Sequence, residues 1–293
     1  MIGELLPAAV VTVEARLDEG DTAALEAGLY PEEAALVAQA VTKRRREFAV
    51  VRSCARRAME KLGVPPQPVL SGERGAPRWP RGLAGSMTHC DGYCAAALVR
   101  VTDLASLGID AEPHGPLPEG VGPAVTLPAE RDRLRRLTAA RPEIHWDRLL
   151  FSAKESVYKT WYPLTGKWLD FSGADIDLWT DPAPAPDAGA GPDAGGGGDW
   201  NRDPGRDPGL GQHPGLGPHP YPGLGPRSGL GPHSGLGPYP GPGPDPGHGA
   251  HGGLRAELLV PGPTVGGRRV QTFEGRWTVQ RGLVATAIAL PYE

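Results

Sequence analysis

Phe151-Ser-Ala-Lys-Glu-Ser-Val-Tyr-Lys159 is the stretch that decides the interpretation of this chain, and Gly108-Ile-Asp-Ala-Glu112 stands upstream of it. From His145 to Tyr162, around the first stretch, apolar residues recur at helical spacing: Trp146, Leu149, Leu150, Ala153, Val157 and Trp161. This spacing predicts an amphipathic helix. Glu155 and Lys159 are four residues apart, so they would be neighbours on its polar side.

The upstream stretch predicts a strand from Leu104 to Glu112, ended by Pro113 because proline cannot keep donating to a sheet. Side chains two apart on a strand point the same way, so Asp110 and Glu112 share a face. If the helix crosses the strand end, three carboxylates surround one point beside Lys159, and such oxygen ligands suit Mg2+. For each motif taken alone, an ordinary helix salt bridge or a strand-end Asp-x-Glu stays open as the alternative.

Composition excludes several classes of protein. The chain has 293 residues, a formal charge of -4 and only three cysteines, Cys54, Cys90 and Cys94. This charge gives no reason to expect a nucleic-acid partner, and few, odd-numbered cysteines fit a reducing cytosol. The start Met-Ile-Gly-Glu lacks a signal-peptide pattern, and no apolar run reaches the roughly 18 residues of a membrane span. We therefore expect a cytoplasmic protein without a membrane partner.

A low-complexity tract runs from Asp181 to Gly253, where more than half of the residues are Gly or Pro. It has too few large apolar side chains to offset the entropy of ordering, so we interpret it as a disordered surface insertion. Its seven acidic and three basic residues account for the whole net charge. Five histidines lie in it, and a weak metal-binding role for them stays open: His213, His219, His233, His248 and His251.

The remaining segments alternate between helix and strand patterns. Helices are predicted over 31–39 and 43–62, another begins near 126–130, and 71–82 is turn-rich. The strands 85–89 and 93–101 form a predicted hairpin through Asp91-Gly92, and strands resume over 254–260 and 276–290. This alternation predicts an α/β or α+β fold of two lobes. We place the N-terminal lobe at 1–113 and the C-terminal lobe, interrupted by the insert at 181–253, at 114–293.

Two further clusters could bind phosphate. The helix over 43–62 is strongly basic, with Arg44, Arg45, Arg52 and Arg56, and either captures a phosphate or presents a solvated face. Thr88 and His89 precede a turn and could hydrogen-bond a phosphate, or His89 could be structural. There is no second ligand pair for zinc, no phosphate-binding glycine loop and no hydrolase elbow.

In combination, these segments resemble the Sfp/EntD-type 4'-phosphopantetheinyl transferases, especially the actinobacterial branch. The ordered pair of Gly-Ile-Asp-x-Glu and x-x-Lys-Glu-x-x-x-Lys carries the resemblance more specifically than either motif alone. The other matching segments are Lys43-Arg-Arg-Arg-Glu-Phe48, Arg52-Ser-Cys-Ala-Arg56, Gly75-Ala-Pro-Arg-Trp-Pro80, Gly85-Ser-Met-Thr-His-Cys90, Trp161 to Leu169 and Gly275-Arg-Trp-Thr-Val279. The resemblance covers nearly all of the chain except the insert.

The resemblance implies a pseudo-dimer of two similar lobes in one chain, with the active site between them. It also implies transfer of the phosphopantetheine arm of coenzyme A to a serine of acyl or peptidyl carrier proteins, with Mg2+ as cofactor and adenosine 3',5'-bisphosphate as product. Such carriers serve fatty acid, polyketide, nonribosomal peptide and siderophore biosynthesis. A monomer is expected.

By the same resemblance, the implied metal ligands are Asp110, Ala111 through its backbone carbonyl, Glu112 and Glu155. Glu155, Lys159 and His89 would be catalytic, and Glu155 would take the serine proton directly or through a water. The implied coenzyme contacts are Arg44 and Arg52 at the 3'-phosphate, Ser71, Gly72, Glu73 and Arg74 beside the adenine nucleotide, Thr88, His89 and Lys159 at the pyrophosphate, Asp110 and Glu155 through the metal, and Leu169 along the coenzyme. Where some relatives have a basic residue before the turn proline, this chain has Ala76, and Arg74 is the candidate substitute.

Two alternatives remain beside the transferase. One is a non-catalytic module that binds coenzyme A or a nucleotide on the same fold. The other is a metal-binding or interaction protein that acts through the His/Gly/Pro-rich tract.

Overall fold

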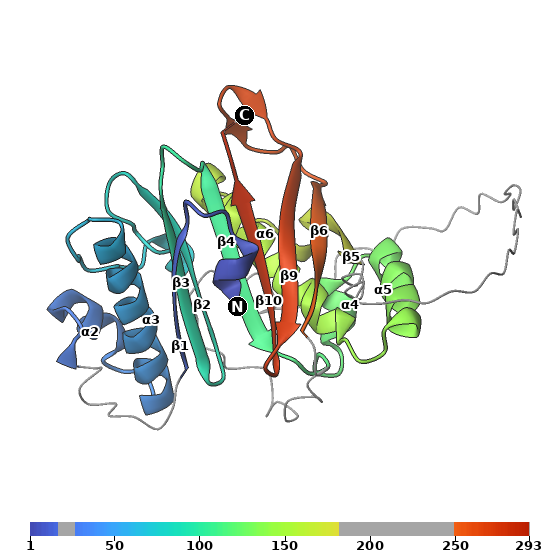
Figure 1. Cartoon of the computed structure of the whole chain (residues 1–293), viewed down its shortest axis with the longest axis horizontal. Helices are drawn as coiled ribbons and strands as arrows, with labels where there is room; N and C mark the ends of the chain where they lie inside the picture. The colour runs from blue at the N-terminus through green and yellow to red at the C-terminus, as the bar shows by residue number, and fades with distance from the viewer. Residues whose placement is uncertain (17–26, 182–248, 293) are drawn as a thin grey trace, which may run out of the picture. The chain divides into compact units, whose positions relative to one another are not determined.

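The computed structural model describes residues 1–16, 27–181 and 249–292, which form one mixed unit of helices and antiparallel strands (Figure 1). The strands are β1 (Val11–Arg16), β2 (Leu83–Cys90), β3 (Tyr93–Arg100), β4 (Ser106–Pro113), β5 (Ala174–Thr180), β6 (Ala250–Leu258), β7 (Thr264–Val265), β8 (Arg268–Arg269), β9 (Thr272–Gln280) and β10 (Leu283–Leu290). The α-helices are α2 (Pro31–Val37), α3 (Thr42–Lys61), α4 (Val121–Val125), α5 (Pro128–Ala140) and α6 (Trp146–Thr165). The short 3-10 helices are η1 (Ile2–Leu5), η2 (Glu73–Gly75) and η3 (Phe171–Gly173).

The N-terminal lobe is a three-stranded sheet in the order β1-β3-β2, with α3 packed on one face (Figure 1). The hairpin between β2 and β3 turns at Asp91-Gly92, as predicted, and Gly92 has the positive φ of 71° that such a turn requires. On the α3 side of the sheet, the small residues Cys94 and Ala96 of β3 let the helix approach closely. The core between them contains Val50, Val51, Cys54, Ala55, Ala58, Met59, Met87, Cys94, Ala96 and Leu98.

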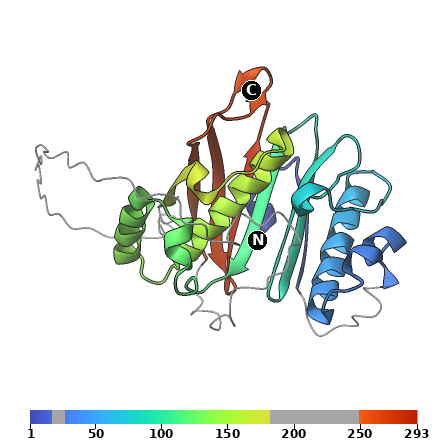
Figure 2. The same ribbon diagram turned by 180° about the vertical axis from the view of Figure 1, so that it is seen from behind.

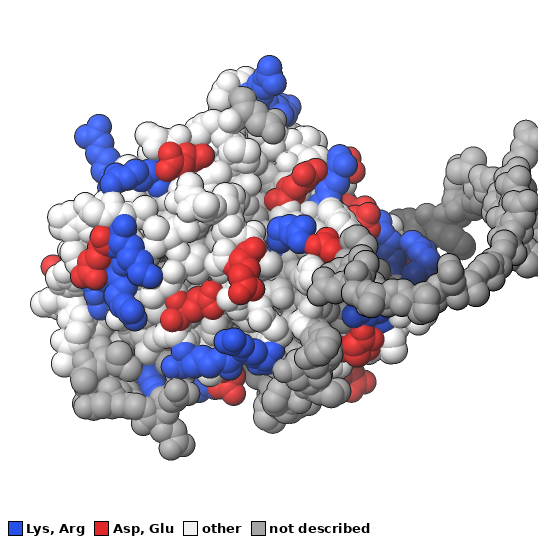
Figure 3. Space-filling model, in the orientation of Figure 1, with Lys and Arg blue, Asp and Glu red and all other residues white. Residues whose placement is uncertain are grey.

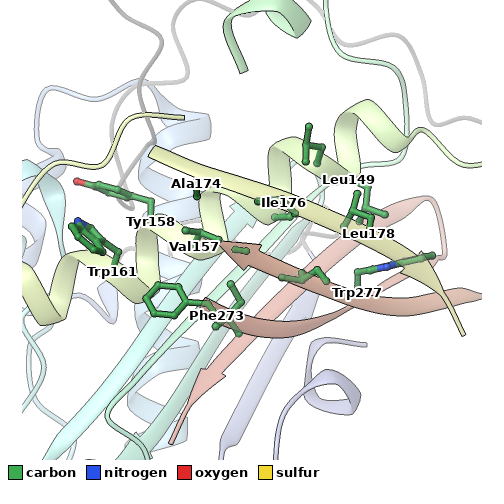
Figure 4. Packing of buried hydrophobic residues seen from close by; sticks show 14 of the residues in the cluster. Leu149, Val157, Tyr158, Trp161, Ala174, Ile176, Leu178, Phe273 and Trp277 are labelled. Carbon is green, nitrogen blue, oxygen red and sulfur yellow. The ribbon is translucent and has the colours of Figure 1, made fainter. Parts of the chain in front are cut away.

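The C-terminal lobe is a five-stranded antiparallel sheet in the order β4-β10-β9-β6-β5, crossed by α6 (Figure 2). The helical spacing of apolar residues in the sequence matches this packing, because α6 turns them towards the sheet. Figure 4 shows Leu149, Val157, Tyr158 and Trp161 of α6 beside residues of β5 and β9. The predicted helix is therefore confirmed, and it ends at Gly166, whose φ of 63° closes the last turn.

The two sheets meet along β2 and β4 through side chains and not through a continuous strand ladder. The backbone N–H of Ile109 donates to Ser86 Oγ, and that of Ala111 donates to Thr88 Oγ1, both at 3.1 Å. A second core joins the sheets on the other face, where η1 covers them, and contains Ile2, Tyr93, Ala95, Ala97, Val99, Leu107, Ile109, Ala111, Leu283, Ala285 and Ala287. The junction therefore brings the end of β2 beside the end of β4.

Three predicted boundaries need correction. Because β4 pairs with β10, the division between lobes falls between Arg100 and Ser106 and not after Pro113. The predicted strand over 276–290 is two strands, β9 and β10, which turn at Arg281-Gly282. The low-complexity insert ends earlier than predicted, because residues 250–253 belong to β6. Gly252 lies against Trp277 there, and a side chain at this position would clash.

The mixed α+β class is confirmed, with one 20-residue helix on each sheet. The pseudo-dimer relation between the lobes stays a prediction. The hypothesis of disorder concerns 182–248, which lie outside the described residues. Within the described part, no helix is both long and apolar enough to cross a membrane. On the face seen in Figure 3, basic and acidic side chains are interspersed.

Candidate active site

The approach of α6 to β4 sets the geometry of the candidate site. Gly108 lies directly under the helix: a Cβ there would come within 2.1 Å of the Ser156 carbonyl oxygen and 2.5 Å of Thr160 Oγ1. Only glycine permits this approach, which explains the first residue of the Gly-Ile-Asp-x-Glu motif. As a result, Lys159 Nζ reaches β4 and donates to Asp110 Oδ1 at 2.8 Å and to the Ile109 carbonyl at 3.1 Å.

The three predicted metal carboxylates are buried. Asp110, Glu112 and Glu155 are 4%, 7% and 3% exposed. Asp110 and Glu155 are shielded from solvent because α6 packs directly over the end of β4. Asp110 Oδ2 has no hydrogen-bond partner among the described residues.

Charge on Glu112 is opposed by its surroundings. Burial, followed by the charge of Asp110, raises the pKa of Glu112 to about 8, although Arg148 lies 3.2 Å away and Lys159 is also nearby. Glu155 adds to the repulsion. Arg148 is itself buried and donates to the carbonyls of Gly115 and Pro116, so it holds the chain that follows β4.

The convergence of three carboxylates on one point is not formed in the described part of the chain. There, no group of three or more His, Cys, Asp or Glu side chains is gathered closely enough to hold a metal ion. The physical reason is visible in the partners: Lys159 takes one oxygen of Asp110, and Arg148 takes one of Glu112. The negative charges of Asp110 and Glu155 nevertheless both act on Glu112 and raise its pKa.

Thr88 and His89 extend the site onto β2. Thr88 Oγ1 donates to Asp110 Oδ1 at 3.2 Å while accepting from Ala111, so the hydroxyl fixes the carboxylate to the strand junction. His89 Nε2 lies 2.6 Å from Arg44 Nη1. The predicted pyrophosphate contact, His89, is therefore next to the predicted 3'-phosphate contact, Arg44. Burial lowers the pKa of Arg44, and the charge of Glu47 opposes that effect.

Arg52 is completely buried, so it does not belong to a solvated basic face. Its Nε donates to the Val69 carbonyl at 2.9 Å, and its guanidinium carbon lies 4.0 Å from the centre of the Phe48 ring. Burial lowers the pKa of Arg52 to about 9. One terminal nitrogen, Nη2, of both Arg52 and Arg44 is buried without a hydrogen-bond partner among the described residues. Two such donors are a reason to expect an anion at this place.

A cavity of about 380 Å³ opens between the lobes beside Lys159. Its wall includes Gly72, Glu73, Trp79, Met87, Tyr158 and Tyr162, from the segment after α3, from β2 and from α6. The predicted adenine segment therefore supplies two lining residues, Gly72 and Glu73. Ser71 is held by a bridge to Pro77, and the Arg74 guanidinium lies 5.3 Å from the Trp168 ring centre.

Leu169 is buried, and its contact with the coenzyme stays a prediction. Leu169 is 4% exposed and packs in the core under α6, where its side chain abuts Gly173. Its neighbour Trp168 is 40% exposed and stacks edge-on against Tyr158, which lines the cavity.

Sequence reasoning also missed Glu47, Arg148 and the aromatic wall of Tyr158 and Tyr162. Glu47 lies inside the quoted segment Lys43 to Phe48, and its position one turn after Arg44 was the available signal. Arg148 lies two turns before Glu155 on α6, so a helical-face argument could have placed it near the carboxylates.

The fold and this site define a class of two-lobed proteins in which a lysine lines a cavity between two sheets and pairs with a buried carboxylate. Family models identify the class. The model of the 4'-phosphopantetheinyl transferase N-terminal domain matches residues 32–99, and that of the 4'-phosphopantetheinyl transferase superfamily matches residues 106–196.

Curated relatives agree over most of the chain. The chain is 46% identical to 4'-phosphopantetheinyl transferase Svp of Streptomyces mobaraensis over 99% of its length and 89% of the relative's. It is 40% identical to PptT of Mycobacterium tuberculosis over 89% of this chain and 85% of that protein. It is 38% identical to Npt of Nocardia iowensis over 99% of both chains. The chain therefore belongs to the 4'-phosphopantetheinyl transferase family, and the resemblance inferred from its motifs is confirmed.

Proposed function

We propose that this 4'-phosphopantetheinyl transferase moves the phosphopantetheine arm of coenzyme A to a serine of acyl or peptidyl carrier proteins, with Mg2+ as cofactor. The observation that carries the proposal is the Lys159–Asp110 pair at the edge of the cavity, tied to Thr88 and to the carboxylates beside it. A phosphate-transfer site needs cations that stabilise charge on phosphoryl oxygens, and Lys159 is such a cation.

The donor set fits Mg2+, although in the described part of the chain the carboxylates are not gathered around one point. Asp110 Oδ2 is buried with no hydrogen-bond partner among the residues that the structure describes, and burial together with negative neighbours raises the pKa of Glu112. A divalent cation among Asp110, Glu112 and Glu155 would remove both penalties. The Ala111 side chain lies in the core, so only its backbone oxygen is available as the predicted further ligand. The chemistry that Mg2+ supplies when bound is positive charge on the pyrophosphate oxygens.

The residues of this chain would then divide the work. Lys159 and His89 would bind the pyrophosphate oxygens, and Arg44 and Arg52 would bind the 3'-phosphate. The serine hydroxyl would attack the phosphorus that bears the pantetheine arm, and its proton would pass to Glu155, directly or through a water. The phosphorus–oxygen bond to the nucleotide would break, which releases adenosine 3',5'-bisphosphate.

The cavity supports the position of the arm. Its aromatic and aliphatic wall, with Trp79, Met87, Tyr158 and Tyr162, suits a slender chain with alternating apolar and amide groups. Gly72 and Glu73 line it, and Ser71 to Arg74 remain the predicted neighbours of the adenine nucleotide.

Mass spectrometry of a carrier protein incubated with coenzyme A and the full chain tests the proposal. We expect the carrier to gain one phosphopantetheine group with Mg2+ and none after chelation. Binding of coenzyme A without any modification would favour the non-catalytic alternative. The role of the tract concerns residues outside the described part, and metal titration of the isolated tract tests it.

The carrier class is also a proposal. Enterobactin synthase component D of Salmonella typhimurium is 34% identical over 119 residues, 40% of this chain, and its name supports a siderophore role. Fatty acid, polyketide and nonribosomal peptide carriers are the other substrates to compare.

A further inference from the structure

Glu47 occupies a position between two predicted phosphate-binding side chains. It lies one turn after Arg44 on α3, and its Oε2 is 3.8 Å from Arg44 Nη1. The same oxygen is 3.6 Å from His89 Nε2 at the end of β2. The Glu47, Arg44 and His89 side chains are only 6%, 12% and 8% exposed, so water screens their charges weakly.

The contact between Arg44 and His89 fixes which atom carries a proton. Arginine has no acceptor, so at 2.6 Å Arg44 Nη1 must donate and His89 Nε2 must accept. In this contact Nε2 therefore carries no proton. A phosphate oxygen only accepts, so Nε2 cannot bind it until that nitrogen has gained a proton.

Glu47 is suited to stabilise that proton. A carboxylate this close to an imidazole nitrogen favours the charged imidazolium, and it also holds the Arg44 guanidinium in place. The other charged or titratable groups around Glu47 are Lys43 on α3, Asp91 in the turn after β2 and the Cys94 thiol on β3. Lys43 and Asp91 are exposed and pair with each other at 2.9 Å, so they contribute little.

We propose that Glu47 is a positioning residue that couples coenzyme binding to proton uptake: it holds Arg44 in the free enzyme and supplies the negative charge with which His89 becomes a donor to phosphate. The inference rests on the proposed function, because it takes Arg44 and His89 as phosphate contacts. A residue that only stabilised α3 would change the melting temperature without changing the proton balance of binding.

Calorimetric titration of the full chain with coenzyme A, in buffers of different ionisation enthalpy, measures the protons taken up. Between about pH 6.5 and 8.5, we expect the wild type to take up as much as about one proton and Glu47→Gln clearly less. Coenzyme affinity should fall about tenfold in Glu47→Gln, and the loss should grow with pH because a neutral imidazole is then the predominant form. The effect should fall on KM for coenzyme A more than on kcat. Glu47→Asp keeps the charge and should retain the uptake.

Two controls separate this role from general damage. Glu130 is another buried carboxylate paired with a cation, on a different element, and Glu130→Gln should leave proton uptake unchanged. In a His89→Gln background, adding Glu47→Gln should change proton uptake no further, because the proton acceptor is gone. If Glu47→Gln fails to fold, the wild type, Glu47→Asp and His89→Gln still decide: uptake that persists in His89→Gln overturns the inference.

Two experimental outcomes separate the role of Glu47 from the proposed function. A wild type that binds coenzyme A and modifies a carrier, but takes up equal protons with and without the Glu47 carboxylate, overturns the role of Glu47 alone. A wild type that neither binds coenzyme A nor modifies a carrier overturns the proposed function and this inference together.

Discussion

Lys154 and Glu130 form a buried ion pair, with 2.8 Å between Nζ and Oε1, on the side of α6 that faces away from Lys159. Lys154 also donates to the carbonyls of Phe171 and Ala174, both at 2.7 Å, and Glu130 accepts from the backbone of Ile176. The two lysines of one sequence motif therefore have different partners: one ties α6 to α5 and β5, and the other reaches Asp110.

Replacing each lysine in turn should separate these roles. Lys154→Ala leaves Glu130 buried and unpaired, so we expect a loss of about 3 kcal/mol in unfolding free energy. Lys159→Ala should cost less stability and abolish carrier modification. Urea unfolding and mass spectrometry of the carrier measure the two effects. Equal stability losses in both variants, or transfer by Lys159→Ala at the wild-type rate, would contradict the division.

Asp110→Ala and Glu155→Ala should each abolish transfer while the protein stays folded. Both carboxylates are buried and Asp110 pairs with Lys159, so some stability is lost, but neither belongs to a hydrophobic core cluster. Asp110→Asn keeps the shape of the side chain and serves as the matched control for packing. Circular dichroism reports folding, and carrier modification at several Mg2+ concentrations reports activity. Near-normal turnover at ordinary Mg2+ would argue against the metal-site assignment.

Arg44→Ala should weaken the binding of coenzyme A much more than that of dephospho-coenzyme A, because the guanidinium is expected to pair with the 3'-phosphate. Arg52→Ala should show the same preference and also a lower melting temperature, since Arg52 stacks on Phe48 and holds the Val69 carbonyl. Binding of both ligands by titration calorimetry measures the preference. If both ligands weaken equally, the arginines have another role.

Glu112 gives the metal-free protein a defined pH dependence. Its pKa is raised from 4.5 to about 8 in the folded chain, so between these values the folded state holds a proton that the unfolded state has lost. Stability contributed by this group is thus fully present below about pH 4.5 and is lost as the pH rises through 8. The loss is about 1.4 kcal/mol for each unit by which the pKa is raised.

Urea unfolding between about pH 5 and pH 9, without metal, measures this slope. The side chain in Glu112→Gln cannot ionise, so the unfolding free energy of this variant should depend less on pH than that of the wild type. The other titrating groups are common to both proteins. Added Mg2+ should stabilise the wild type more at high pH, because protons and metal compete for the carboxylate. Parallel slopes in the two proteins would show that Glu112 is already charged.

Local sequence patterns predicted the helices and strands of this site better than they predicted how these elements pack together. The periodicity around Glu155 located α6, and the Asp91-Gly92 turn located the β2–β3 hairpin, because both are set by neighbouring residues in sequence. The pairing of β4 with β10 joins residues that are far apart in the chain, so the lobe boundary at Pro113 was misplaced. Burial of Asp110 and the turning of Leu169 into the core likewise depend on tertiary packing, which no local spacing encodes.

The low-complexity insert connects two neighbouring strands of the C-terminal sheet. β5 and β6 are antiparallel neighbours, with Thr180 opposite Gly252, and the Asp181 N–H donates to the His251 carbonyl at 3.1 Å. The two ends of the insert therefore lie side by side, and a short flexible linker can join them without moving either strand.

A deletion of residues 183–247 with such a linker should preserve folding and transferase activity. Deleting 183–251 should lower stability, because it removes Ala250 and His251, which pair with Val279 and Thr278 of β9. Comparing the melting temperatures of the two deletions tests the boundary. The insert carries most of the acidic excess of the chain, so it should repel an acidic carrier, and the shorter deletion should raise the association rate at low salt only. A 183–247 deletion that folds and binds coenzyme A but modifies no carrier would show that the insert takes part in carrier recognition.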